Sequence, residues 1–138
     1  MKHLLLIALS GILLVSCKKA IQKKEEQAVV TDVTNGLWYV THFEQNDSDI
    51  TAAFSGYVFK FDVNNTVTGI LNNTDSVQGE WLVNINARTI SSDFPGAAYP
   101  LNQLNATWYV DDSYTDSVSA QYLDTVYNIP SYLQLKKQ

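Results

Sequence analysis

The chain has little of the side-chain chemistry that enzymes and metal sites use. It carries one cysteine, Cys17, and two histidines, His3 and His42, among its 138 residues. A single cysteine excludes an intramolecular disulfide, so the stability of a folded domain must come from its core. These few ligands cannot build a zinc site, and no glycine-rich phosphate-binding loop is present.

Arrangements of catalytic groups are equally scarce. A histidine-assisted nucleophile would need a hydroxyl and a carboxylate that converge on His42, and nothing in the sequence indicates them. We therefore interpret His42 as a structural or surface residue. Carboxylates recur in two expected loops: Asp47 with Asp49, and Asp111 and Asp112 with Asp116. Neither group has the spacing of a calcium loop. We expect a protein that is not an enzyme and that needs no metal or cofactor.

The charge is unevenly distributed along the chain. From Gly36 onward eleven acidic residues face four basic ones, whereas residues 18–35 hold four lysines against three acids. An acidic domain repels nucleic acid, so we expect no nucleic-acid partner. The basic segment fits either a solvated spacer or a segment that lies near anionic lipid head groups.

The N-terminus has the layout of a secretory signal peptide. Basic residues at positions 2 and 3 precede an apolar run over residues 4–15 and the small residue Ser16. The run is shorter than the about 20 residues of a membrane span. Leu14-Val15-Ser16-Cys17 resembles the lipobox of bacterial lipoproteins. The resemblance implies cleavage before Cys17, a diacylglycerol on its sulfur and an acylated new N-terminus. The alternative is an ordinary signal peptide with a chance cysteine.

These features predict three segments and a location. They are a lipoprotein signal peptide (1–16), a lipidated cysteine with a flexible or partly helical tether (17–35), and a folded domain (36–138). Lys18 and Lys19 follow the anchor, and the acidic Glu25 and Glu26 come late. We therefore expect an outer-membrane lipoprotein of the cell envelope that faces the periplasm.

From Gly36 onward, aromatic and β-branched residues alternate with polar ones, and turn residues recur roughly every ten positions. The pattern predicts eight strands, at 36–44, 56–63, 66–71, 76–84, 87–92, 106–111, 117–122 and 132–136. Single helical turns are expected at 51–54 and 101–104. Tight turns between consecutive strands predict antiparallel neighbours.

A small residue, a tryptophan and a valine recur with the pattern small-x-Trp-x-Val. The three copies begin at Gly36, Gly79 and Ala106. They predict that three strands send Trp38, Trp81 and Trp108 to one interior, with the small residue leaving room for a neighbour or a bend. We list as interior candidates Trp38, Val40, Phe59, Phe61, Trp81, Val83, Trp108, Val110, Leu133 and Leu135.

A meander of this size can close into a small antiparallel up-and-down β-barrel of about eight strands. The start Gly36-Leu-Trp38 is similar to the Gly-x-Trp signature of lipocalins. Together with Phe54-Ser-Gly56-Tyr57-x-Phe59-x-Phe61 and Gly79-x-Trp81-x-Val83, it resembles the lipocalin-like lipoproteins of Bacteroidetes over residues 35–136. The resemblance implies the fold more strongly than ligand carriage. The sequence assigns no Lys or Arg to cover the first Trp, and a β-sandwich is the alternative fold.

Binding is the remaining class of function. An up-and-down meander places the 45–55, 72–75, 93–105 and 123–131 loops at one end. Their apolar residues either fold in as a lid or form a patch that meets a partner. The candidate binding residues are Phe54, Phe94, Tyr99, Leu101, Tyr127 and Ile129. One hypothesis is a small apolar ligand held at this end. The other is a filled barrel that contacts an envelope protein or a glycan, in an assembly or inhibitor role.

Overall fold

The protein is described by a computed structural model covering residues 2–138, with side chains described for residues 17–138 except Leu123. The expected signal peptide (1–16) therefore lies outside the residues whose side chains are described. The elements are α1 (Lys2–Thr34), β1 (Leu37–Gln45), β2 (Ser48–Asp49), η1 (Thr51–Phe54), β3 (Tyr57–Phe61), β4 (Thr66–Leu71), β5 (Asp75–Asn84), β6 (Thr89–Asp93), η2 (Leu101–Leu104), β7 (Ala106–Ser113), β8 (Ser117–Asp124) and β9 (Ile129–Lys137).

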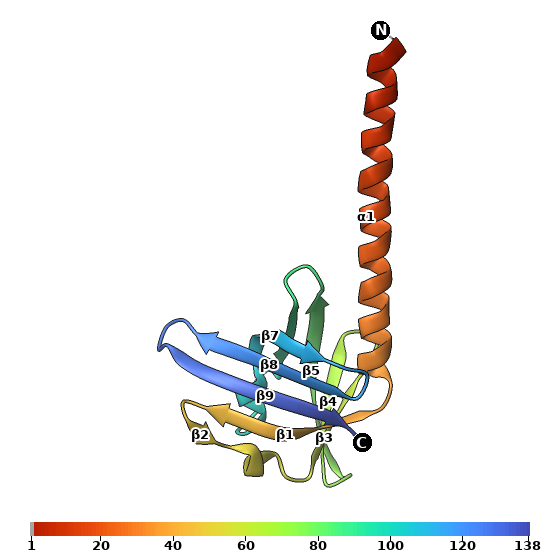
Figure 1. The fold of residues 1–138 in the computed structure, drawn as a ribbon. Helices are drawn as coiled ribbons and strands as arrows, with labels where there is room; N and C mark the ends of the chain where they lie inside the picture. Colours follow the sequence, from red (N-terminus) through yellow and green to blue (C-terminus); the bar gives the residue numbers. More distant parts are fainter. Residues whose placement is uncertain (1) are drawn as a thin grey trace.

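The strands close into an antiparallel up-and-down barrel (Figure 1). Strands β3 to β9 pair in chain order, and β1 closes the ring by pairing with β9 from Trp38 to Gln45. Strand β2 only extends the free edge of β1, at Glu44 and Gln45. The expected barrel of eight strands is confirmed. The β-sandwich alternative is wrong, because the β1–β9 ladder joins the two ends of the meander into one closed sheet.

One expected loop is much shorter in the structure. Strands β8 and β9 stay paired up to Asp124 and Ile129, so a turn of residues 125–128 replaces the expected loop over 123–131. The Asp124 carboxylate accepts hydrogen bonds from the N–H groups of Val126 and Tyr127, at 2.8 and 3.1 Å. Asn128 completes the turn with a φ of 54°. The expected long loop is therefore a tight turn stabilised by the aspartate.

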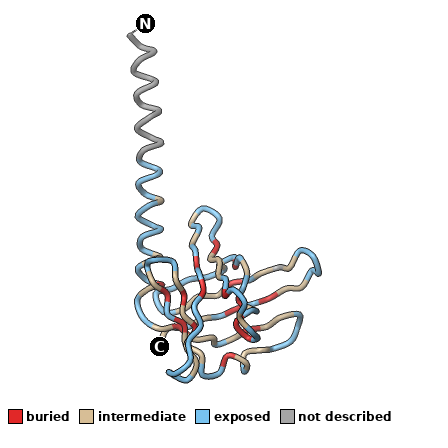
Figure 2. Tube along the Cα trace, turned by 180° about the vertical axis from the view of Figure 1, so that it is seen from behind, coloured by how far each residue is buried: buried red, intermediate tan, exposed pale blue. Residues whose placement is uncertain are grey.

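Large side chains fill the barrel interior. Trp38, Trp81 and Trp108 are 1–3 % exposed, which confirms that the three repeats point to one core. Each indole N–H donates to a main-chain carbonyl at 2.8–3.1 Å, so burial leaves none of the three indole donors unpaired. Gly79 provides the predicted room, because a Cβ there would lie 2.8 Å from the Phe94 ring. In Figure 2 the buried residues are spread over the barrel strands. A barrel of eight strands encloses little more than its own side chains.

The barrel has two distinct ends. The loops over residues 46–56, 72–74, 94–105 and 125–128 alternate along the meander with the turns over 62–65, 85–88 and 114–116. We call the first set the loop end and the second set the helix end. Helix α1 lies at the helix end, where the Gln22 side chain donates to the side-chain oxygen of Asn86 at 3.0 Å. The long loops therefore lie at the end of the barrel opposite α1.

The C-terminal part of α1 belongs to the folded domain. Val33 is 7 % exposed and packs into the core with Val29 and Val30, and its carbonyl accepts the Trp38 indole N–H. Sequence analysis expected a flexible or partly helical tether up to residue 35. The contact of Val33 with the barrel core was not predicted, because three valines in a charged segment do not form an apolar helical stripe long enough to be recognised.

Lys137 supplies the cation over the first tryptophan. Its ammonium nitrogen lies 5.0 Å from the centre of the Trp38 ring and donates to the Asp32 carbonyl at 2.9 Å. The C-terminus accordingly lies beside the base of α1 in Figure 1. A lysine one position earlier or later would point to the other side of β9. The sequence alone does not give the register between β9 and β1, so it could not assign Lys137 to Trp38.

We expect Lys137→Met to lower the free energy of unfolding by about 1 kcal/mol, because it keeps the apolar stem but removes the cation–π contact and the hydrogen bond to α1. Chemical denaturation monitored by tryptophan fluorescence measures this loss. Lys136→Met is the matched control, since Lys136 is exposed. Equal stability of the two variants would contradict a role for the Lys137 contact.

Candidate binding site at an open seam of the barrel

Three of the six candidate binding residues close the loop end from inside. Phe54, Phe94 and Leu101 are 3 %, 1 % and 2 % exposed. The one-turn helices η1 and η2, which sequence analysis expected, carry Phe54 and Leu101 into the core. Phe54 stacks on Phe43 with ring centres 5.3 Å apart. These residues form the lid, the first of the two arrangements considered for the loops.

The other three candidates do not share a surface with them. Tyr99 and Tyr127 are 58 % and 74 % exposed on two different loops, and Ile129 is half-buried at the start of β9. An apolar molecule would find no continuous patch made of all six residues. The structure therefore divides the predicted set into a buried lid, two separate exposed tyrosines and the half-buried Ile129.

A cleft opens elsewhere in the barrel, where β1 and β3 separate. The two strands pair only at Leu37 with Lys60 and at Trp38 with Phe59. The same register would next pair Tyr39 with Val58, and then Val40 with Tyr57. Instead these four residues line a cleft of about 610 Å³. We call this cleft the seam.

Helix η1 holds the seam open. Phe43 of β1 bonds to the η1 segment rather than to a strand, since its N–H donates to the Thr51 hydroxyl and its carbonyl accepts from Ile50 N–H, both at 2.8 Å. A β-bulge between Val40 and His42 also bends β1 at this level. Strand β3 thus begins beyond η1 and reaches β1 only at the helix end. The seam widens toward the loop end.

The turn between β4 and β5 forms the wall of the seam opposite β1. Asn72 and Asn73 both have positive φ, at 50° and 59°, which is typical of a tight hairpin turn. The Asn72 N–H donates to the Gly56 carbonyl at 2.9 Å. Gly56 has a φ of 84°, and a Cβ there would collide with the Asn72 side chain. The two asparagines are therefore held in place by the backbone, with exposed side chains.

The lining of the seam is uncharged and largely polar. Of its twelve residues, seven carry a hydroxyl or a carboxamide and none has a charged side chain: Tyr39, Val40, Thr51, Ala52, Phe54, Ser55, Gly56, Tyr57, Val58, Asn72, Asn73 and Gln138. Tyr39 and Tyr57 are half-buried, and both line the cleft. A cavity of this size falls within the usual range of small-molecule sites.

Charged groups occur nearby but outside the lining. Hydrogen bonds from the Thr51 hydroxyl and N–H hold the pKa of Asp49 below its ordinary value, so this carboxylate is ionised at neutral pH. His42 lies 3.6 Å from Glu44, as the expected surface or structural residue. Among the side chains that the structure describes, no three His, Cys, Asp or Glu groups come together in a way that could hold a metal ion.

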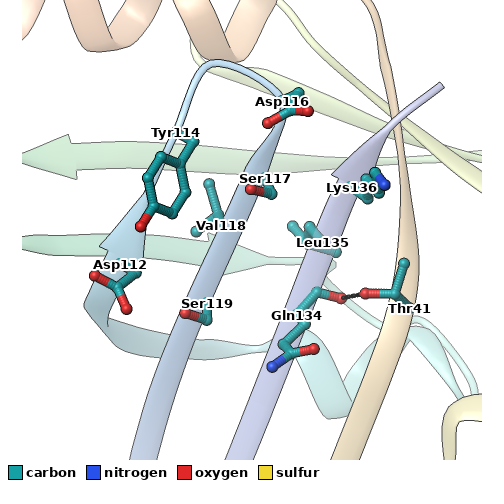
Figure 3. Close-up of a pocket in the computed structure, with 10 residues that line it drawn as sticks. All are labelled: Thr41, Asp112, Tyr114, Asp116, Ser117, Val118, Ser119, Gln134, Leu135 and Lys136. Atoms are coloured by element: carbon teal, nitrogen blue, oxygen red, sulfur yellow. Dashed lines mark hydrogen bonds between the residues drawn. The ribbon is translucent and has the colours of Figure 1, made fainter.

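A second groove, of about 330 Å³, lies on the outer face of β7, β8 and β9 (Figure 3). Its lining includes Asp112, Asp116 and Lys136, and the Thr41 hydroxyl donates to the Gln134 carbonyl at 3.3 Å beside it. Mixed charges of this kind are typical of a solvated barrel face. The seam differs from this groove in its size and its lack of charge.

The seam was not predicted from the sequence, although Phe54, one of the six candidate binding residues, lies in its lining. The nearest signals were Gly56, interpreted as the start of a strand, and residues 72–75, interpreted as a loop. The separation of β1 from β3 depends on how η1 packs against Phe43, and a strand pattern does not contain that information. Only the observed register places Tyr39 and Tyr57 at one cleft.

Comparison with known proteins gives the fold and no family. No protein-family model matches the chain, and no curated protein matches it. Among solved structures, a DUF4847 family protein from Bacteroides vulgatus is similar, with a TM-score of 0.55 and 16 % sequence identity. The match covers 80 % of this chain and 99 % of that chain. At this identity the similarity shows that the two chains share a barrel-like fold.

Proposed function

We propose that this protein is a lipid-anchored binding protein of the cell envelope, whose filled barrel recognises its partner at the seam and encloses no ligand. The observation that carries the proposal is that side chains fill the barrel interior, whereas the seam between β1 and β3 is an open cleft in the barrel wall whose lining has no charged side chain. A ligand inside the barrel would have to displace buried aromatic rings, which are packed at a density that leaves no free volume of that size. This favours the filled-barrel hypothesis over the apolar-ligand hypothesis.

The membrane anchor in this proposal rests on the sequence around Cys17. Its side chain is exposed on α1, so its sulfur is accessible to modification. No helix is long and apolar enough to cross a membrane among the residues that the structure describes. A chain that begins at Cys17 would keep α1 from Cys17 to Thr34 as a helical spacer of about 27 Å. The seam would then open away from the bilayer.

The proposed location remains the outer membrane, with the domain facing the periplasm. Lys18 and Lys19 directly follow the anchor and are exposed, as a segment near anionic head groups requires. Protease treatment of intact cells distinguishes the two sides of the membrane, because a periplasmic domain is protected. Rapid loss of the domain would place it on the cell surface.

The binding site is tested by photo-crosslinking in intact cells. A photoreactive amino acid at Ser55, which is exposed in the seam with an ordinary φ of −59°, is expected to form an adduct with the partner. The same amino acid at Val126, 79 % exposed in the turn between β8 and β9, is the control. Adducts from Val126 and none from Ser55 would refute the seam as the site.

A further inference from the structure

We infer that the seam binds a neutral carbohydrate, an inference that rests on the proposed function and names the ligand class of the same site. Any ligand of the seam must match a lining that has no charged side chain. An ionic group buried there would lose its hydration without gaining a side chain of opposite charge. The domain from Gly36 onward has seven more acidic than basic residues (eleven against four), which further disfavours an anion.

The lining also disfavours a purely apolar ligand. Seven of the twelve lining residues present hydroxyls or carboxamides. The Thr51 hydroxyl already bonds to the Phe43 N–H, but an apolar molecule would cover the amides of Asn72 and Asn73 without offering them a partner. A carboxamide offers two donors and one acceptor oxygen, which suits the paired hydroxyl groups of a sugar ring. Asn72 and Asn73 sit on a turn whose backbone fixes where their side chains begin, so binding has to order only their side-chain torsions.

The two tyrosines supply the apolar part of the site. Tyr39 lies on the outer face of β1, while Tyr57 stacks on Phe59 with ring centres 6.1 Å apart and is held in place by the core. Accessible aromatic faces can pack against the C–H groups of a pyranose ring while the hydroxyls meet the amides. The combination of supported rings and uncharged amides is the chemistry that recognises a neutral polyhydroxyl ligand.

A peptide strand is disfavoured by the short open edge of β1. Alternate residues of a strand direct their main-chain groups to opposite neighbours, and Leu37 accepts from Gln138 on the β9 side. The N–H of Val40 therefore faces the seam. The next group on that side, Phe43, is already bonded to Thr51 and Ile50. One free residue cannot support the ladder that strand addition needs.

The test is saturation-transfer NMR on the full-length chain in detergent, with maltotriose, cellotriose and tri-N-acetylchitotriose as neutral probes at millimolar concentration. Trigalacturonate is the anionic control. We expect transfer to at least one neutral probe and none to the anion. Tyr39→Ala and Asn73→Asp should each weaken binding by about tenfold or more, one by removing the ring and the other by adding a charge.

Matched variants separate the site from general effects. Tyr109→Ala removes an exposed tyrosine from the outer face of β7, and Asn128→Asp adds the same charge at a positive φ in another loop-end turn. Both should bind as the unmodified chain does. Equal loss in all four variants would refute the seam as the sugar site, and equal binding of trigalacturonate would refute the preference for neutral sugars.

The two proposals fail in different ways. If no neutral probe binds and the Ser55 photo-crosslink yields a protein adduct, the carbohydrate inference is wrong and the seam remains a binding site. If no probe binds and Ser55 yields no adduct, both proposals are wrong. A glycan adduct at Ser55 together with loss of binding in Asn73→Asp would support both.

Discussion

Trp81→Ala is expected to lower the free energy of unfolding by about 3–5 kcal/mol, the usual cost of truncating a large aromatic residue in a core. Trp81 is 1 % exposed and meets Phe61 edge to face, with ring centres 5.4 Å apart. Its indole N–H donates to the Asp62 carbonyl at 3.0 Å, so the variant also leaves that carbonyl without its partner. A loss of this size is a large fraction of the stability of a typical domain.

Denaturant titration followed by circular dichroism measures this effect, and Leu82→Ala is the control. Leu82 is the next residue on β5 but points outward and is 59 % exposed. Its truncation should change stability by less than about 0.5 kcal/mol. Phe59→Ala, at a second core position that is 2 % exposed, should behave like Trp81→Ala. Wild-type midpoints for both core variants would contradict the alternation of inward and outward residues.

Cys17→Ala is expected to move the protein from the membrane fraction to the soluble fraction without unfolding the barrel. Two or more acyl chains hold a protein stably at a bilayer, and the variant cannot carry the lipid on its sulfur. Cys17 is exposed on α1, whereas the barrel is contacted by Gln22, through its hydrogen bond to Asn86, and by the valines that pack on the core from Val29 onward. Removing the sulfur should therefore leave the fold intact.

Detergent phase partitioning measures the anchor, and the denaturation midpoint of the same sample measures the fold. Ser16→Ala is the matched control, because it retains a small residue before the cysteine and should keep the protein in the detergent phase. A Cys17→Ala protein that still partitions like wild type would rule out lipidation at this residue. A variant that partitions to water but has a lower midpoint would show that Cys17 also supports the fold.

Much of the fold follows from local pattern. Alternation of inward and outward residues predicted the strands, and turn residues such as Asn64-Asn65 predicted antiparallel neighbours. The two helical turns at 51–54 and 101–104 were also predicted. Closure into a barrel follows because a meander of this length otherwise leaves two unprotected edges. The structure confirms these elements and their order.

The site was much less predictable than the fold. Sequence analysis treated the apolar loop residues as one group, but Phe54 and Leu101 are buried while Tyr99 and Tyr127 are exposed. Burial of a loop residue depends on how far its segment folds over the core, and composition does not encode that distance. The docking of Val33 was missed because three valines are too few to mark an apolar helical face, and the placement of Lys137 over Trp38 was missed because it depends on the register between β9 and β1.

The sequence by itself determined the strand pattern, the convergence of three tryptophans on one interior, the acidity of the domain and the lipobox-like segment at Cys17. These properties are local or additive, so neighbouring residues and simple counts suffice. Only the tertiary structure decided that the interior is filled, that α1 packs on the barrel, and that β1 and β3 part after Trp38 to open the seam. Those features depend on register and on packing between residues distant in sequence, which no local pattern specifies.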